Sequence, residues 1–288
     1  MRRMLCMLTA CWLLISIIGG MAQAEPLTAW VIAPVENGLT ADFDADGTQE
    51  SVTLAADLDE YRCGGFTLTV GGASVTRENV EGLNETVYAL PVGSVGYSAS
   101  AQEPYAAIFM VAEEGPSDDP LTYCYLYQDG ELTDVGVIPA MPTAMTAGLD
   151  GIISTFVRCD VLGTWSRPAD YALARGYAFG EDDFRVYYRL TEVPRDIYPL
   201  GMILELKVDL PLLAARGDTT YTGMLAADEN PQVVVSATDG VRWLYLTSMD
   251  GETAGWVKID REDWRTRVYR AGLPLDCDEV FGNIFYAD

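Results

Sequence analysis

Alternation of apolar and polar residues in short runs is the feature of this 288-residue chain that most limits its fold. Residues 66–70 (FTLTV), 121–127 (LTYCYLY) and 184–190 (FRVYYRL) all alternate, and Gly, Asp or Pro turns separate such runs. Side chains of a strand point to its two faces in turn, whereas a helix repeats about every 3.6 residues. Little of the chain beyond residue 24 has the helical period. The pattern therefore predicts an all-β protein.

The run 121–127 makes this prediction specific. It places its three tyrosines on one face of a strand and its Thr, Cys and Leu residues on the other. Asp129 and Gly130 follow it directly, and Asp-Gly is a favoured dipeptide for a tight hairpin turn. We expect a hairpin whose first strand presents a tyrosine face.

A weak internal repeat extends from residue 42 to about residue 195. Three blocks of roughly fifty residues each contain a turn, an apolar strand and a strand rich in Tyr or Phe. Blade-like sheets produce this pattern, but closed propellers typically have about four to eight blades. The repeat therefore predicts either a reduced propeller-like array or a β-sandwich.

A domain boundary is expected at Pro194 and Pro199, because closely spaced prolines interrupt strand pairing. We divide the chain into a leader at residues 1–24, a β-repeat domain at 25–196 and a second β domain at 197–288.

The leader has the features of a signal peptide. Two arginines precede an apolar run at residues 5–18, which is shorter than the ~20 residues that span a bilayer, and an A-x-A cleavage signal ends at Ala24. The chain is therefore expected to be secreted or associated with the cell envelope, without an integral membrane domain after cleavage. A lipid anchor on Cys11, within the sequence LTAC, is the less favoured alternative because the main apolar stretch follows it. An uncleaved anchor is a third interpretation.

Charge and the absence of histidine exclude several functions. Asp and Glu total 43 and Lys and Arg total 18, giving a net charge of −25, and there is no histidine. A polyanion repels nucleic acid and anionic lipid. Without histidine there is no Ser-His-Asp triad, no Cys-His pair and no imidazole metal ligand. Most of the excess acid lies in residues 25–160, which contain 22 acidic and three basic residues.

The sharpest chemical signal is the acidic stretch at residues 42–50 (DFDADGTQE). Alternate carboxylates in one turn repel each other unless a hard cation with oxygen ligands binds between them. We predict a calcium site with five candidate ligands: the side chains of Asp42, Asp44, Asp46 and Glu50 and the backbone carbonyl of Thr48. The stretch is not an EF-hand, because Thr53 occupies the position of the bidentate glutamate.

This stretch resembles the calcium loops between strands of FG-GAP and VCBS-type propeller repeats, although Glu50 replaces the more usual Asp. The resemblance covers about a dozen residues, and it implies a structural Ca²⁺ that fixes a hairpin rather than a catalytic ion. The alternative is a solvated acidic turn without an ion.

Residues 206–259 resemble a bacterial SH3-like (SH3b) barrel. A strand with Trp243 and Tyr245 is followed by an Asp-Gly turn and by the sequence GWV at residues 255–257. The resemblance implies a small barrel that binds a cell-wall peptide or an envelope protein. Trp243, Tyr245 and Trp256 are the candidate ligand-binding rings, and the alternative is that they fill the barrel core, which we favour for Trp256.

Four cysteines remain after residue 24: Cys63, Cys124, Cys159 and Cys277. In an exported protein they can form two disulfides with three possible pairings, or they can be free thiols in the core. The chain contains no C-x-x-C sequence, which argues against a dithiol redox site.

These features favour a non-enzymatic, exported binding or scaffold protein over an enzyme. The alternative is a glycan hydrolase with paired carboxylates, for which the acid pairs Asp118-Asp119 and Asp182-Asp183 are the candidates. A purely architectural ectodomain of an envelope complex is the third hypothesis.

Overall fold

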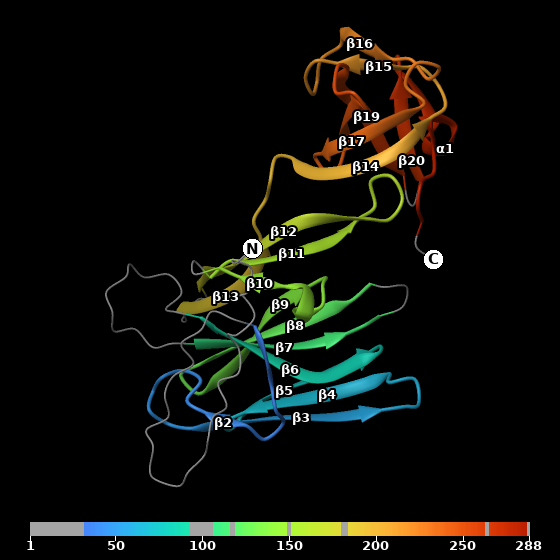
Figure 1. The fold of residues 1–288 in the computed structure, drawn as a ribbon. Coiled ribbons are helices and arrows are strands. Elements are labelled where there is room, and N and C mark those ends of the chain that lie inside the picture. The colour runs from blue at the N-terminus through green and yellow to red at the C-terminus, as the bar shows by residue number, and fades with distance from the viewer. Residues whose placement is uncertain are drawn as a thin grey trace, which may run out of the picture.

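The computed structural model describes residues 32–92, 106–115, 119–148, 151–179, 184–262 and 265–286. Regular structure in these ranges is almost entirely β-strand, and α1 (Cys277–Val280) has only four residues. The predicted all-β fold is therefore confirmed. The predicted leader at residues 1–24, with Cys11, lies outside the described residues. Figure 1 shows the N-terminal sheets stacked below a C-terminal β unit.

Each of the three repeat blocks forms an antiparallel sheet, and its strands are consecutive except that β1 joins the edge of the middle sheet. The first sheet contains β2 (Thr40–Ala41), β3 (Glu50–Leu58), β4 (Gly64–Val70) and β5 (Ala73–Val80). The middle sheet contains β1 (Ala33–Val35), β6 (Leu83–Val92), β7 (Ala106–Glu113), β8 (Leu121–Gln128) and β9 (Glu131–Ile138). The short 3-10 helix η2 (Pro142–Ala144) leads to the third sheet, which contains β10 (Thr146–Ala147), β11 (Ile153–Cys159), β12 (Trp165–Phe179) and β13 (Phe184–Glu192).

The middle sheet is covered on both faces. Tyr123, Tyr125 and Tyr127 belong to the core against the first sheet, whereas Cys124 and Leu126 belong to the core against the third sheet. All eight residues of β7 are buried, as expected for a strand between two layers. The predicted tyrosine face is therefore confirmed, and its tyrosines line one of the two cores.

The hairpin turn after β8 is also confirmed. Asp129 and Gly130 have positive φ angles of 53° and 74°, and β8 pairs with β9 directly across them. Two consecutive left-handed residues match the right-handed twist of the flanking strands, which is why Asp-Gly is favoured there.

The C-terminal unit is one large sheet with two further strands. Its path runs through β16 (Tyr221–Leu225), β15 (Leu210–Leu213), β19 (Ala254–Glu262), β18 (Trp243–Ser248), β17 (Gln232–Thr238), β14 (Tyr198–Leu206) and β22 (Phe281–Gly282). β20 (Arg265–Arg270) pairs with β19 and with β21 (Leu273–Asp276). The predicted small barrel is open in the described residues, because β16 and β22 end the path without pairing with each other.

One loop joins the two parts of the molecule. The buried core of the C-terminal unit includes Cys159, the last residue of β11, and Val161 and Leu162 of the loop between β11 and β12. The Thr266 hydroxyl, on β20, donates a hydrogen bond of 2.7 Å to the carbonyl oxygen of Val161. Apart from this loop, buried core residues up to Leu190 belong to the N-terminal sheets, and those from Met202 onward belong to the C-terminal core. The change lies close to the boundary expected at residue 196.

All four cysteines are free thiols. Cys124, Cys159 and Cys277 are buried, and burial raises the pKa of each thiol. They therefore serve as small apolar core residues rather than as nucleophiles at neutral pH.

Candidate metal centre

The acidic stretch forms the loop between β2 and β3, which are paired neighbours. Residues 42–49 therefore leave the first sheet and return to it at adjacent points. Phe43 is 3% exposed and packs edge-on against Phe109 of the middle sheet, with ring centroids 5.0 Å apart. This contact draws the residues beside Phe43 into the protein. The positive φ angles of Ala45 (57°) and Gly47 (88°) bend the chain back toward β3.

Three carboxylates of the loop meet in the interior. Asp42, Asp44 and Glu50 are 5%, 1% and 4% exposed, and one oxygen atom from each lies within 4.8 Å of the others. Carboxylates are rarely buried to this degree without a positively charged partner. None of the ion pairs among the described residues includes any of the three.

Backbone N–H groups hold the three carboxylates in place. Glu50 Oε2 accepts a hydrogen bond from Phe43 N at 2.9 Å, and Asp42 Oδ2 accepts one from Gly47 N at 3.1 Å. Asp44 Oδ2 accepts one from Gly130 N at 3.3 Å, so the β8–β9 turn of the middle sheet also supports the loop. The remaining oxygen of Asp42, Oδ1, is buried and has no hydrogen-bond partner among the described residues.

The electrostatics of the triad favour a positive ligand. Burial raises the pKa of Asp44 and of Glu50, and the neighbouring carboxylates add to both shifts. Burial and the charges of Glu50 and Asp44 also raise the pKa of Tyr127 to about 12. Each shift shows negative charge that is disfavoured in the folded protein. A cation bound among the oxygens would reverse this cost.

The structure brings together three of the five predicted ligands. Asp46 and Thr48 are exposed, and the Thr48 N–H donates to Asp46 Oδ1 at 2.6 Å. The Asp46 carboxylate is still close enough to raise the pKa values of Asp44 and Glu50. Asp46 therefore lies at the solvent side of the loop, beside the buried triad.

Residues distant in the sequence also surround the triad, and the acidic stretch at 42–50 does not predict them. Gly130 and Tyr127 come from the β8–β9 hairpin, more than 75 residues away in the chain. Gly71, with φ of +62°, forms part of the wall: a Cβ atom there would lie 2.8 Å from Tyr127 Oη and 3.1 Å from Glu50 Cγ. No local pattern connects these positions to residues 42–50.

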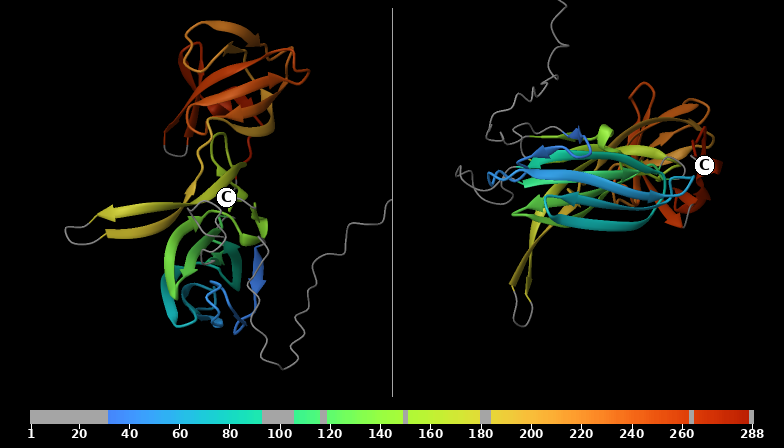
Figure 2. Two further views of the ribbon diagram at one scale, coloured as in Figure 1. Left: turned by 90° about the vertical axis from the view of Figure 1, so that its left-hand side faces the viewer. Right: turned by 90° about the horizontal axis from the view of Figure 1, so that it is seen from below.

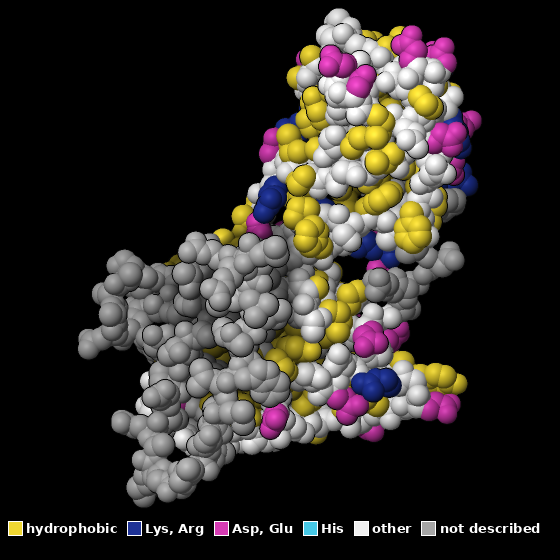
Figure 3. Space-filling model, viewed as in Figure 1, with side chains coloured by type: hydrophobic (Ala, Val, Ile, Leu, Met, Phe, Trp, Pro, Cys, Tyr) yellow, Lys and Arg dark blue, Asp and Glu magenta, His cyan; other side chains and the backbone are white. Residues whose placement is uncertain are grey.

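The candidate aromatic residues lie on the outer face of the C-terminal sheet. Leu244, Leu246 and Val257 point into the core, so the alternating residues Trp243, Tyr245 and Trp256 point away from it and are half-buried. The preference for Trp256 as a core residue is therefore wrong. Figure 3 shows hydrophobic side chains on the C-terminal unit, on the face turned to the viewer.

Two of these rings form a defined contact. Tyr245 and Trp256 are cross-strand partners on β18 and β19, with ring centroids 5.1 Å apart. The Arg216 guanidinium lies 5.3 Å from the centre of the Trp256 ring. Arg216 also pairs with Asp196, so the face combines aromatic surface with an ion pair.

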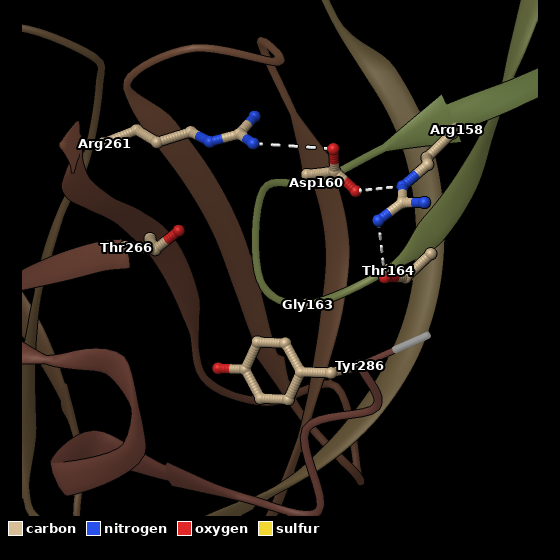
Figure 4. Close-up of a pocket in the computed structure, with 7 residues that line it drawn as sticks. All are labelled: Arg158, Asp160, Gly163, Thr164, Arg261, Thr266 and Tyr286. Carbon is tan, nitrogen blue, oxygen red and sulfur yellow. Dashed lines mark hydrogen bonds and ion pairs between the residues drawn. The ribbon is translucent and has the colours of Figure 1, made fainter. Parts of the chain in front are cut away.

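A pocket of about 210 Å³ lies where the β11–β12 loop meets the C-terminal unit (Figure 4). Its charged groups pair with one another: Asp160 accepts from Arg158 Nε at 2.6 Å and from Arg261 at 3.4 Å. Arg158 also pairs with Asp119 at 2.7 Å. Because its cations already have anionic partners, the pocket functions as a junction between the two parts of the chain.

The acid pairs that favoured a hydrolase do not form a described site. Asp118, Asp182 and Asp183 lie outside the described residues, and Asp119 pairs with Arg158. The buried triad does not replace them, because groups 1–5% exposed are closed to a glycan chain.

No protein-family model, no curated protein and no solved structure matches this chain. Among the described residues, no helix has the length and apolar character needed to cross a bilayer.

Proposed function

We propose that this chain is an exported, non-enzymatic binding or scaffold protein whose N-terminal sheets are held together by a structural Ca²⁺ ion. The observation that carries the proposal is the buried triad of Asp42, Asp44 and Glu50, which has an unpartnered oxygen and no positive partner among the described residues. The ion would supply the missing positive charge.

The ligand chemistry favours calcium among the common cations. The triad offers only oxygen atoms, whereas zinc sites in proteins usually contain His or Cys. Magnesium demands near-ideal octahedral geometry, while Ca²⁺ accepts six to eight oxygens in irregular arrangements. Asp46, the Thr48 carbonyl and water at the exposed side of the loop are the sources proposed for the remaining ligands.

The position of the triad supports a structural role for the ion. Asp42 and Asp44 lie in the β2–β3 loop of the first sheet and Glu50 begins β3, whereas the Gly130 N–H that binds Asp44 lies in the β8–β9 turn of the middle sheet. A cation in the triad would therefore fix the loop, and through Asp44 it would also fix the contact between two sheets.

Thermal unfolding with and without calcium tests the site. We expect the melting temperature to rise on adding Ca²⁺ to chelator-treated protein, because a ligand that binds only the folded state stabilises it by about 2.7 kcal/mol at 100 times its dissociation constant. Asp44→Ala should abolish the rise. Ser51→Ala, at an exposed position beside the loop, is the matched control and should keep it. An unchanged melting temperature for the wild type would remove the ion from the proposal.

The outer aromatic face is the proposed binding surface for a cell-wall peptide or an envelope protein. Half-buried aromatic rings offer contact area at low entropic cost, and Arg216, which pairs with Asp196, lies beside the Trp256 ring. Co-sedimentation with purified cell wall tests this surface. Trp243→Ala should reduce the bound fraction, while Phe156→Ala, on the exposed side of the third sheet, should not. Equal binding by the Trp243→Ala protein would exclude this surface.

A further inference from the structure

The hairpin of β12 and β13 extends well beyond the sheet to which it belongs. β12 has fifteen residues, but only residues 165–171 pair with β11, and residues 172–179 pair with β13 alone. Figure 2 shows this two-stranded hairpin projecting from the body in both views. An isolated two-stranded hairpin is marginally stable in water, because it has no third layer on which to bury its side chains.

An apolar stripe runs outward along one face of the hairpin. Cross-strand partners share a face, and Leu173 pairs with Leu190 while Tyr177 pairs with Val186. Leu190 is buried in the core between the middle and third sheets, whereas Tyr177 and Val186, farther out, are 51% and 37% exposed. The stripe thus continues the core into solvent.

The opposite face carries a second exposed ring. Tyr187 is 49% exposed and lies across Gly176, where a Cβ atom would be only 2.3 Å from the ring. Because Gly176 has no side chain, the Tyr187 ring can pack directly against the backbone of β12. Both faces of the projecting part present aromatic surface.

The charge of the hairpin differs from the acidic average of the chain. Its two projecting arms, residues 172–179 and 184–191, contain three arginines and no acidic residue. With the three acids at residues 181–183, between the two arms in the sequence, the segment 172–191 is neutral, in a chain with a net charge of −25. Repulsion between copies is therefore weaker at the hairpin than the net charge of the chain implies, and the basic arms fit an acidic surface.

The β3–β4 turn of the first sheet offers a surface with the complementary chemistry. Asp57, Asp59 and Glu60 are exposed there beside Tyr61, which is 74% exposed. The one arginine of the turn, Arg62, is paired with Glu85 at 3.4 Å. Figure 1 places this turn at the right-hand ends of β3 and β4, and Figure 2 shows the hairpin projecting in another direction. The two surfaces can therefore meet between copies.

We propose that the β12–β13 hairpin of one copy docks on the acidic β3–β4 turn of a second copy. Arg189 and Tyr187, which lie on the same face of the hairpin, face Glu60 and Tyr61 of the neighbour in this contact. Because two different surfaces meet, the contact is head-to-tail, and repeated contacts extend into a chain of molecules or close into a ring. The association does not depend on the proposed calcium ion.

Sedimentation velocity on paired variants tests this contact. The hairpin variant carries Tyr187→Ser and Arg189→Gln, and the turn variant carries Glu60→Gln and Tyr61→Ser. We expect wild-type protein to show a weight-average mass above the monomer that rises with concentration. Each variant alone should associate at least about tenfold more weakly, the effect typical of losing an aromatic or arginine anchor.

The mixture of the two variants is decisive. The turn variant keeps an intact hairpin and the hairpin variant keeps an intact turn, so an equimolar mixture should form dimers that cannot extend. Recovery of association also shows that both variants are folded. Phe156→Ser, at a residue 65% exposed on β11, is the control and should associate like the wild type.

Three results would overturn the proposal. Wild-type protein that stays monomeric at every concentration would leave the hairpin to a different partner. A hairpin variant that associates like the wild type would exclude the hairpin. A turn variant that still self-associates, with no dimer in the mixture, would show that hairpins pair with each other instead.

Discussion

Two groups of partly or fully buried carboxylates in this molecule have opposite electrostatic surroundings. Asp44 and Glu50 lie in the loop of the first sheet, and their pKa values are raised by burial and by neighbouring acids. Asp170 and Glu192 lie on the third sheet, and hydrogen bonds from Arg195 and Arg167 lower their pKa values. The ionised carboxylate is thus disfavoured in the first group and stabilised in the second.

The two groups differ in the source of the positive charge beside the carboxylates. The third sheet and the segment after it contain arginines that pair with their own acids, and the guanidinium of Arg167 also lies over the Tyr198 ring. The triad has no such partner among the described residues, although the sequence around it has the strongest excess of acid. We infer that the positive charge at the triad comes from outside the chain.

The largest effect is expected from removing an arginine of the paired group. Arg167→Ala leaves the mostly buried Glu192 carboxylate without its guanidinium, and losing a hydrogen bond to a charged group costs about 1.5–3 kcal/mol. We expect the free energy of unfolding to fall by about 2 kcal/mol, measured by urea denaturation at neutral pH. Arg261→Ala, at a residue 45% exposed, is the matched control and should cost about 0–1 kcal/mol. Equal losses of unfolding free energy for the two variants would show that burial does not make the Arg167–Glu192 pair stronger than the Arg261–Asp160 pair.

A substitution in the triad should change the free energy of unfolding by less, and the sign of the change should differ with and without calcium. Asp42→Asn keeps an oxygen for Gly47 N but removes one buried negative charge. In chelator it should stabilise the protein by roughly 1 kcal/mol, because it removes repulsion and the cost of burying a charge. In calcium it should instead be less stable than the wild type. Urea denaturation in both buffers measures the two signs, and Asp46→Asn, at an exposed ligand candidate, should change less in each.

Destabilisation by Asp42→Asn in chelator would contradict the view that the triad repels itself. A change of the same size in both buffers would likewise separate Asp42 from any cation.

The pH dependence should differ between the two groups in direction. The raised pKa values of Asp44 and Glu50 mean that their contribution to stability is full below their unfolded values, near the ordinary 3.8 and 4.5, and is lost as pH rises through the folded values. The lowered pKa values of Asp170 and Glu192 mean the reverse: their contribution is present above the unfolded values and is lost as pH falls through the folded ones.

Unfolding free energies measured in chelator across the acid-to-neutral range test this. The advantage of Glu50→Gln over the wild type should grow as pH rises from about 4. By contrast, Glu192→Gln should lose stability relative to the wild type over the same rise. Parallel curves for Glu50→Gln and the wild type would show that Glu50 is not disfavoured as an anion in the folded state.

The sequence predicted the parts of the fold that depend on local pattern. The alternation at residues 121–127 gave the tyrosine face, and Asp129-Gly130 gave the turn, because strand period and left-handed φ angles are local properties. The sides taken by Trp243 and Trp256 were not predictable in the same way. Both faces of their strands are rich in large apolar residues, and only the packing of Leu244 and Leu246 into the core shows which face is inside.

The candidate metal centre was predictable in its loop but not in its surroundings. The spacing predicted Asp42, Asp44 and Glu50, whose carboxylates are buried together, yet it also predicted Asp46, which is exposed. The difference follows from Phe43, whose packing against Phe109 buries the residues on either side of it. The support from Gly130 depends on two sheets meeting, which no local pattern encodes.

Calcium binding measured by equilibrium dialysis is the most direct test of the claim that the triad takes its positive charge from an ion. Chelator-treated protein is dialysed against Ca²⁺ in about 0.1 M salt, which screens weak binding to exposed acids. The account predicts saturation at one ion per chain, with binding weakened at least about tenfold by Asp42→Asn or Asp44→Asn and less by Asp46→Asn. Absence of saturable binding, or equal binding by the wild type and Asp42→Asn, would contradict it.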